Sequence, residues 1–494
     1  YSPVYSIVGA PAGSTPRELD YPTDSGQANY TYTGTGGIPI GSLVNKLMFA
    51  VKYQEPNIVL SDTINSDSRI LEVRDPRDRV RKMAPWLTVD GDPYPVVVDG
   101  KVLWMVDGYT TTNEYPNATH TDFGDATTDT TTQNAKNVIS QSRDEINYIR
   151  NSVKATVDAY TGQVVLYAWD EQDPVLQTWM KAFPGTVQPR ASMPEALLAH
   201  VRYPEDIFKV QREIFAQYHV TDPGGFYSGQ DFWTVPNDPT KPAASSAQPP
   251  YYLQVQMPNQ STPAFSLTTT FAPNKRQTLA AFMAANSEPG PDYGKLRVLQ
   301  LPSNTTIPGP VQAQNNFESD PSTSSQLSLL RRGGSEVDLG NLLSLPVAGG
   351  MLYVEPVYIR SAAQDGYPLL QKVLAGYGNK VSFQDTLAEA LADVLGTGDG
   401  TTTPPPSGGG NGTGDLTAQQ RLTAALAAID KAYADGQTAL AKGDFAAYGQ
   451  AQSALKAALD DAIAAQREIT GTSPAPSSSG SPSPSPSTSG ASAA

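Results

Sequence analysis

Acidic residues at closely spaced turns are the part of this sequence best suited to chemistry. The stretch "LTVDGDPYPVVVDGKVLWMVDGYTTTNEYP", residues 87–116, contains three Asp-Gly pairs, which begin at Asp90, Asp99 and Asp107. Carboxylates can act as general acids and bases, or can supply the hard oxygen ligands that Ca²⁺ prefers. The question is whether these pairs are three turns or the corners of one site.

The residues around Asp99 predict a turn. Apolar, largely β-branched runs flank Asp99-Gly100 on both sides, and a two-residue Asp-Gly loop between such runs is typical of a type I′ β-hairpin. Because both runs are apolar on both faces, we expect the hairpin to be buried. Asp90 and Asp107 then bracket its outer ends, which lie near each other in a simple antiparallel pair.

We therefore predict an acidic, aromatic-lined ligand pocket at this end of the hairpin. Sugars and small cations both suit such a pocket. Its candidate ligand-binding residues are Asp92, Tyr94, Trp104 and Tyr109. The candidate metal ligands are Asp90, Asp92 and Asp107, and Ca²⁺ is the only cofactor that the sequence suggests. The alternative is that these carboxylates, like the other acidic pairs of the chain, cap helices and turns.

Other signatures of catalysis are absent from the sequence. It contains no Gly-x-Ser-x-Gly elbow and no His-Glu-x-x-His motif. Among the three histidines, His200 and His219 could ligate a metal together with Asp222, but two ordinary histidines at helix ends are the simpler interpretation. No residue pattern supports a Ser-His-Asp triad.

Composition restricts the partners and the environment. The net charge is −15 and no run of Lys or Arg stands out, which argues against a nucleic-acid partner. The chain has no cysteine, which suggests a secreted bacterial protein that avoids mispaired disulfides in an oxidising space; the alternative is chance in a cysteine-poor proteome. No apolar run reaches the ~18 residues that a transmembrane helix needs, so any anchoring segment must lie outside this chain.

The elements expected from hydrophobic periodicity are mixed along the chain. Helices are predicted at 38–53, with Ser42 as its cap, at 75–86, in three short segments between 173 and 220, at 276–286 and at 383–396. A second hairpin is expected at 151–170, turning at 160–163, and strands at 251–257, 264–272, 295–301 and 349–360. Residues 117–137 read as a polar surface loop, and 236–250 have the composition of a linker.

The predicted fold is α+β and multidomain, with β-hairpins and short helices. Residues 1–245 form a mixed α+β domain and 251–395 a strand-rich α+β domain. Residues 397–415 are a flexible linker, 416–470 an antiparallel helical hairpin that can be detached, and 471–494 a disordered Ser/Pro tail.

Several long blocks of the chain resemble one bacterial family in the same order. They are "NIVLSDTINSDSRILEVRDPRDRVRKMAPWLTVDGDPYPVVVDGKVLWMVDGYTTTNEYP", "NYIRNSVKATVDAYTGQVVLYAWDEQDPVLQTWMKAFPG", "MPEALLAHVRYPEDIFKVQREIFAQYHVTDPGGFYSGQDFW" and "TTTFAPNKRQTLAAFMAANSEPGPDYGKLRVLQLP". The family is the uncharacterised bacterial membrane protein family numbered 0182 in the UPF series, and the resemblance covers roughly residues 1–470. Its pattern has Asp-Ala-Tyr-Thr where this chain has Asp107-Gly108-Tyr109-Thr110.

The resemblance implies a polytopic membrane protein with transmembrane helices before a large soluble region, of which this chain would be the soluble part. No catalytic residue can be carried over. We expect a location on the extracytoplasmic side of the cell membrane, and a binding or scaffolding module with an envelope protein or glycan as partner. The competing hypothesis is an envelope hydrolase or transferase that uses carboxylates near residues 90–107 on a glycan or peptide.

Overall fold

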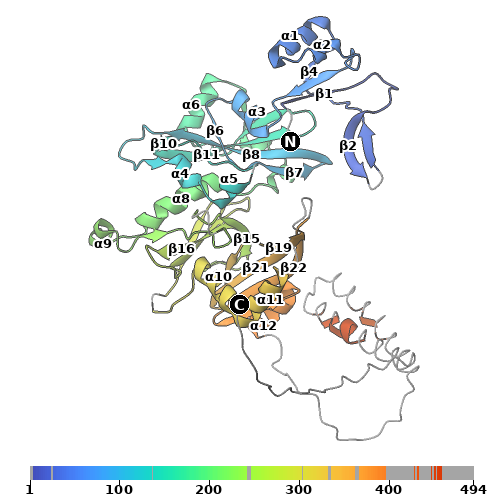
Figure 1. Cartoon of the computed structure of the whole chain (residues 1–494). Coiled ribbons are helices and arrows are strands. Elements are labelled where there is room, and N and C mark those ends of the chain that lie inside the picture. The colour runs from blue at the N-terminus through green and yellow to red at the C-terminus, as the bar shows by residue number, and fades with distance from the viewer. Residues whose placement is uncertain are drawn as a thin grey trace, which may run out of the picture. The chain divides into compact units, whose positions relative to one another are not determined.

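The computed structural model describes residues 4–23, 26–135, 137–241, 246–302, 304–331, 335–361, 367–396 and scattered helical residues between 428 and 458. The chain divides into two compact units, residues 1–397 and 398–494, and the elements discussed below belong to the first (Figure 1). Helices and antiparallel strands alternate there, so the predicted α+β class is confirmed. The predicted linker and Ser/Pro tail, and most of the predicted helical hairpin, lie outside the described residues.

A small N-terminal layer begins the first unit. In its three-stranded sheet, β1 and β4 flank β5, and α1 packs beside α2. Ser42 caps α1 as predicted, because its hydroxyl accepts a hydrogen bond from Asn45 N at 3.2 Å. The elements are β1 (Tyr5–Val8), β2 (Glu18–Thr23), β3 (Gly26–Tyr30), β4 (Ile38–Pro39), α1 (Leu43–Tyr53), α2 (Asn57–Leu60) and β5 (Arg69–Glu72).

A six-stranded sheet follows, in the order β13-β12-β11-β8-β6, with β7 also paired to β8. Its long central pair is antiparallel, and the predicted turn at 160–163 joins β11 to β12. The elements are α3 (Pro76–Met83), β6 (Thr88–Val89), β7 (Tyr94–Val98), β8 (Lys101–Thr112), β11 (Tyr148–Asp158), β12 (Val164–Ala168), α6 (Pro174–Ala182), β13 (Val187–Gln188), η1 (Arg190–Ser192), α7 (Glu195–Leu198), α8 (Glu205–Tyr218) and α9 (Pro223–Ser228).

The hairpin predicted around Asp99-Gly100 is confirmed. Strands β7 and β8 flank this turn, with φ of +50° at Asp99 and +74° at Gly100, as a type I′ turn requires. The expectation that both faces are buried is wrong. Val96 and Val98 are buried, whereas Val97 between them is 66% exposed, because successive side chains of a strand point to opposite faces and only one face of β7 is covered.

The predicted surface loop at 117–137 is wrong for most of its length. It contains β9 (Thr121–Asp122), α4 (Phe123–Thr127) and α5 (Thr130–Asn134), and β9 pairs with β10 (Glu145–Ile146). Phe123 and Thr127 are buried, and the Thr127 hydroxyl donates to Phe123 O at 2.8 Å. Side-chain hydrogen bonds of this kind allow a Thr-rich segment to be buried.

Two further antiparallel sheets complete the unit. One has the order β14-β16-β17-β18 with β15 beside β16, and the other has the order β19-β21-β22-β23 with β20 beside β21. The elements are β14 (Trp233–Thr234), β15 (Tyr251–Val255), β16 (Ala264–Pro273), β17 (Ala281–Asn286), β18 (Leu296–Gln300), α10 (Pro310–Ser319), α11 (Pro321–Leu330), β19 (Ser335–Leu339), β20 (Leu343–Val347), β21 (Gly350–Ser361), β22 (Leu369–Tyr377), β23 (Lys380–Gln384) and α12 (Leu387–Leu395).

The predicted helix at 276–286 is wrong, because residues 281–286 form the strand β17. This strand lies between β16 and β18 and is buried along its whole length. Ala281, Met283 and Ala285 belong to one buried cluster, while Phe282 and Ala284 belong to another. Packing on both faces has overridden the helix propensity of its alanines.

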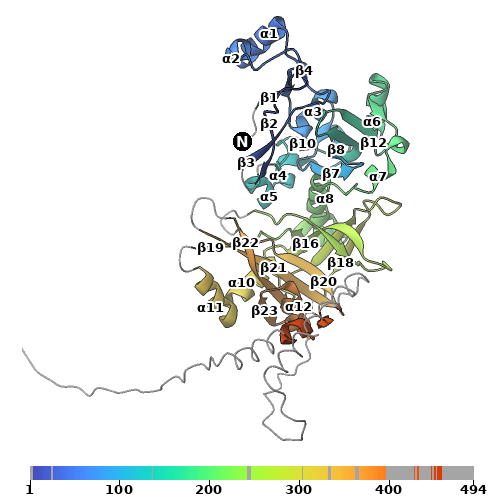
Figure 2. The same ribbon diagram turned by 90° about the vertical axis from the view of Figure 1, so that its right-hand side faces the viewer.

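Helix α8 lies between the six-stranded sheet and β16 (Figures 1 and 2). One buried cluster contains Tyr109 from β8, Phe208 from α8 and Phe271 from β16. Residues 236–250 are also packed in part: Asn237 bridges to Ala247, and buried Gln248 donates to Leu342 O at 2.9 Å. The expected division into domains 1–245 and 251–395 stays a prediction.

Candidate functional site

The two acidic corners of the hairpin do come together, but inside the protein. Asp90 N donates to Asp107 O at 2.9 Å, and the two residues are only 2% and 5% exposed. Strand β8 places its odd-numbered side chains on one face, so Met105, Asp107 and Tyr109 all point inward together. The outer two Asp-Gly pairs are therefore buried corners, and the middle pair is a turn.

Each predicted carboxylate has its own protein partner. Asp107 forms an ion pair with Lys154 of β11 and accepts from Asn151 Nδ2 at 3.0 Å. Asp90 accepts a hydrogen bond from the Tyr109 hydroxyl and, at 2.7 Å, from Asp92 N. These contacts engage Asp107 Oδ1 and both carboxylate oxygens of Asp90, on which the predicted Ca²⁺ site depends.

Asp92 and Tyr94 lie nearer the surface and share a partner. The Asp92 carboxylate pairs with Arg202 at 2.9 Å, and the Arg202 guanidinium lies 3.8 Å from the centre of the Tyr94 ring. Tyr94 and Arg202 line an open groove of about 430 Å³. Trp104 is on the opposite face of β8 and lines a different hollow. The four predicted ligand-binding residues are thus divided between the groove, the core and another surface.

Helix α8 contributes Glu205 and Asp206, one of the chain's other acidic pairs, for which helix capping was the simpler interpretation, and Lys209, which the sequence analysis did not select. Asp206 accepts from Gly91 N at 2.9 Å and from Gln141 Nε2 at 2.6 Å. Lys209 Nζ lies 2.7 Å from the Asp129 carboxylate and 3.6 Å from that of Glu205. The spacing of Glu205 and Lys209 by one helical turn is the signal that could have found this cluster.

Burial controls the ionisation of this cluster. It raises the pKa of Asp206 well above its usual range, and the nearby negative charge of Asp90 raises it further. Burial also raises the pKa of Asp107 and lowers that of Lys154, and the attraction between the two opposes both shifts. Burial raises the pKa of Glu205 to about 7. The ionisation of each of these groups depends on the charges of the others, so the cluster couples β8, β11 and α8 electrostatically.

The histidines and the acidic residues give no metal centre in the described part of the chain. His219 stacks on Trp233 with ring centres 3.6 Å apart, and Asp222 caps α9. Among the described residues, no group of three or more His, Asp and Glu side chains is arranged to hold a metal ion. Calcium binding by Asp90, Asp92 and Asp107 stays a prediction.

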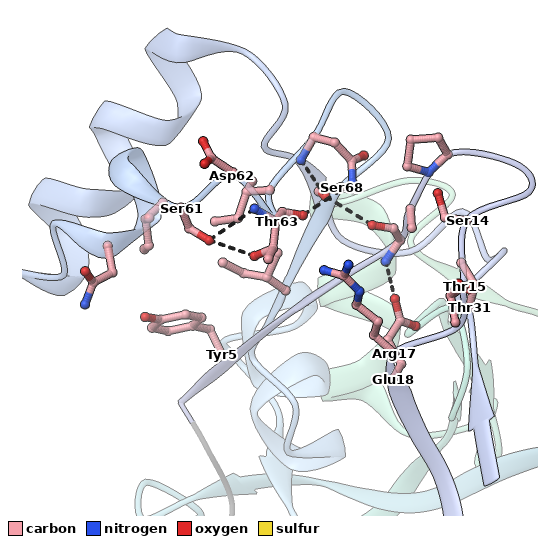
Figure 3. A pocket seen from close by; sticks show the side chains of 18 of the residues that line it. Tyr5, Ser14, Thr15, Arg17, Glu18, Thr31, Ser61, Asp62, Thr63 and Ser68 are labelled. Atoms are coloured by element: carbon pink, nitrogen blue, oxygen red, sulfur yellow. Dashed lines mark hydrogen bonds between the residues drawn. The ribbon is translucent and has the colours of Figure 1, made fainter.

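An open pocket of about 880 Å³ lies in the N-terminal layer (Figure 3). It is formed by β1, the segment 9–18, α2 and the segment 61–68. Hydroxyl, amide and charged side chains dominate its lining, and Tyr5, Ile7 and Ile58 add apolar surface. Its polar lining residues include Ser14, Thr15, Arg17, Glu18, Thr31, Glu55, Asn57, Ser61, Asp62, Thr63, Asn65 and Ser68.

Internal hydrogen bonds hold the walls of this pocket. The Glu18 carboxylate accepts from Gly9 N and from Tyr32 N, both at 2.6 Å. Buried Ser68 donates to Gly9 O at 3.1 Å. Gly9 has φ of +89°, and a Cβ there would lie 2.7 Å from Asp67 O, so only glycine fits.

The groups directed into the pocket are less constrained than its walls. Arg17 extends its guanidinium towards Thr63 from the opposite wall (Figure 3), and it has no ion-pair partner among residues 4–396 that the structure describes. Ser61 and Thr63 present hydroxyl groups 2.7 Å apart. Such a mixture of donors, acceptors and one aromatic ring suits a polyhydroxylated ligand. The sequence analysis missed this pocket, although the Ser/Asn/Asp-rich run at 61–68 was visible.

Comparisons with known proteins give a single family. The model of the "Uncharacterised protein family (UPF0182)" matches residues 1–330. A UPF0182 protein of Paenarthrobacter aurescens (strain TC1) is 49% identical over 497 residues, which cover 95% of this chain and 50% of that protein. One of Streptomyces coelicolor is 50% identical, over 94% of this chain and 46% of that protein. The chain thus spans about half the length of these relatives. No solved structure matches it.

Proposed function

This chain belongs to the UPF0182 family, and from that premise we propose that it is a non-catalytic binding module within a longer envelope membrane protein. Relatives about twice as long support the view that the chain acts as one part of a larger molecule. In the described residues, none of the helices combines the length and the apolar character needed to cross a bilayer. The proposed link to the membrane therefore runs through segments outside this chain.

The observation that carries the proposal is the engagement of the buried carboxylates. Asp90, Asp107 and Asp206 are each held by donors from the protein itself. A carboxylate that acts on a substrate must be accessible to it in the bound complex, whereas these three are at most 5% exposed. They serve best as internal ties between the sheet and α8.

The pocket of Figure 3 is the proposed ligand site. Its hydroxyl and amide lining, with Tyr5 at one side, suits an oligosaccharide, because sugars present many hydroxyl groups around an apolar ring face. Arg17 adds a site for an anionic substituent. This agrees with a glycan as the proposed envelope partner, and a protein of the envelope is the alternative partner.

The proposed location is the extracytoplasmic side of the cell membrane. The absence of cysteine supports it, since mispaired disulfides are then impossible in an oxidising space. Reporters fused after Ala494 in the intact protein should be active only outside the cytoplasm. Activity confined to the cytoplasm would overturn the location without affecting the proposed binding site.

One observation favours the alternative, a carboxylate-dependent hydrolase or transferase. Glu205 is 14% exposed and has a pKa of about 7, close to the working pH of a general acid. Asp92, near the groove beside Tyr94, also has a raised pKa because of burial. Asp92 and Glu205 thus both have raised pKa values, as groups that carry out acid–base chemistry often do.

A single experiment separates the two functions. The chain is incubated with a panel of envelope oligosaccharides and peptides, and binding and product formation are measured in the same samples. The binding module predicts retention of a ligand with no product. Turnover that is lost in Glu205→Gln would establish the enzyme instead, whereas neither binding nor turnover would contradict both.

A further inference from the structure

Helix α1 carries an apolar face that the rest of the described protein leaves uncovered. At 100° per residue, five of its side chains fall within an arc of about 140°. They are Leu43, Val44, Leu47, Met48 and Val51, with exposed fractions of 64%, 66%, 49%, 65% and 77%. Five large apolar side chains on three turns of one helix are more than the scattered exposure that soluble proteins show.

The opposite face of α1 explains why the helix is held in this orientation. Phe49 is only 8% exposed and packs with Ile58 and Ile70 in the small N-terminal core. Lys46 Nζ donates to Ile64 O at 2.7 Å, and Lys52 forms an ion pair with Glu72. Both cations are therefore drawn towards the body of the protein, and the outward face carries no charge.

Exposed apolar residues are concentrated in this part of the first unit. Of the 25 large apolar side chains exposed among the described residues, eleven lie between Val4 and Leu60. Leu60, at the end of α2, is 74% exposed, and α2 packs directly beside α1. Exposed apolar side chains are thus more frequent in this layer than in the rest of the unit.

The dimensions and charge of this surface decide between candidate occupants. A helix of 11 residues is about 16 Å long, and one face of it falls well short of the ~800 Å² per partner of a standard protein interface. An interfacial lipid-binding helix needs only a continuous apolar face. Helix α1 has no acidic residue, and its two lysines are engaged by Ile64 O and Glu72, so its outward face is apolar throughout.

We propose that α1 binds a lipid bilayer surface by inserting its outward face at the boundary between headgroups and acyl chains. The helix lies in the plane of the membrane, with Leu43, Leu47 and Val51 towards the lipid. This contact adds to any anchor that lies outside the chain, and it does not depend on the ligand pocket or on the proposed binding function.

Flotation with lipid vesicles tests the proposal on the 494-residue chain. Vesicles of phosphatidylcholine alone, and with added phosphatidylglycerol, are used at low and at high salt. The test variant is Leu47→Glu/Met48→Glu. The matched control is Leu329→Glu/Leu369→Glu, two side chains that are each 62% exposed elsewhere on the same unit. Circular dichroism is used to check that both variants remain folded.

The proposal predicts that the wild type and the control float with neutral vesicles, also at high salt, because apolar burial drives the binding. The α1 variant should partition at least about tenfold less. A tryptophan placed by Met48→Trp should show a blue-shifted emission on the vesicles. Binding that requires anionic lipid and is lost in high salt would overturn the insertion, as would equal flotation of the two double variants. Self-association without flotation, abolished by the α1 variant, would assign the face to a second copy instead.

Discussion

At the scale of single residues, the buried acids fall into two kinds. Asp107 and Asp206 have donors around them, whereas Glu355 on β21 is fully buried and its two carboxylate oxygens accept no hydrogen bond from the described residues. Burial raises the pKa of Glu355 to about 8. Glu355 is therefore neutral in the folded protein at pH 7.

Replacing Glu355 by Gln should change how stability depends on pH. In the unfolded chain this carboxyl ionises above about pH 4.5, but in the folded protein only near pH 8. Its contribution to stability is therefore complete below pH 4.5 and is lost as the pH rises towards 8. We expect Glu355→Gln to have nearly the wild-type Tm at pH 4.5 and a Tm higher by on the order of 5 °C at pH 8. Parallel curves of Tm against pH would contradict this assignment.

Removing one member of the ion pair between Asp107 and Lys154 should destabilise the protein, in contrast to Glu355→Gln. Lys154→Met leaves a buried, unpaired Asp107, and we expect a loss of about 3–5 kcal/mol in the free energy of unfolding. Adding Asp107→Asn to that variant should recover a large part of the loss, since no buried charge then remains. Urea unfolding followed by circular dichroism measures both. A double variant no more stable than Lys154→Met would show that the carboxylate has another role.

Only some of the contacts between these residues could be predicted from the sequence. Asp90 and Asp107 could be placed together because a hairpin brings its own ends together. Their partners are distant along the chain: Lys154 lies 47 positions from Asp107, and Asp206 lies 115 positions from Gly91. Contacts of that kind depend on how sheets and helices pack, which local patterns do not specify.

At the scale of elements, local signals succeeded where they were chemically specific. Ser42 caps α1 as predicted, the helices predicted from residues 75 and 173 begin there, and Asp99-Gly100 marks a turn. The Ala-rich strand β17 was mistaken for a helix, because a strand buried on both faces shows no alternation of polar and apolar residues. The Thr-rich segment 121–134 was mistaken for a surface loop. It forms two helices, because hydrogen bonds within the segment satisfy its polar groups.

The turn between β7 and β8 offers a clean measurement of backbone strain. Gly100 has φ of +74°, and a Cβ there would meet no atom within 4 Å. Gly100→Ala should therefore destabilise the protein through the backbone alone, by about 1 kcal/mol. Asp99→Asn is the matched control, since Asn also accepts a positive φ, and it should be nearly neutral. If thermal unfolding shows that Gly100→Ala leaves the stability of the protein unchanged, the turn is of another type.

At the scale of the whole molecule, the chain divides into two units, residues 1–397 and 398–494. Helix α12 ends at Leu395 with Gly396 in a left-handed conformation, and Ala390 and Val394 pack on β22. Helix α12 thus ends, and packs against its own unit, before the division at residue 397. The composition of residues 397–415, rich in Gly, Thr and Pro, predicted a boundary at this position.

Truncation after Thr397 should leave the first unit folded. We expect unchanged near-UV circular dichroism and a Tm within about 2 °C of the intact chain, since each unit has its own contacts. Aggregation of the truncated protein would show that residues 398–494 are needed to cover it. The same truncation leaves α1 in place, so vesicle binding through that helix should persist.

Binding at the pocket of Figure 3 is the central claim, and glycan-array binding of a pocket variant tests it most directly. Thr63→Trp fills the pocket, whereas Thr178→Trp, at an exposed position on α6, places the same ring outside it. We predict that the wild type and Thr178→Trp retain the same set of envelope oligosaccharides, and that Thr63→Trp loses them at least tenfold while its Tm is unchanged. Equal binding by all three proteins, or no binding by the wild type to any glycan, would contradict the proposed site.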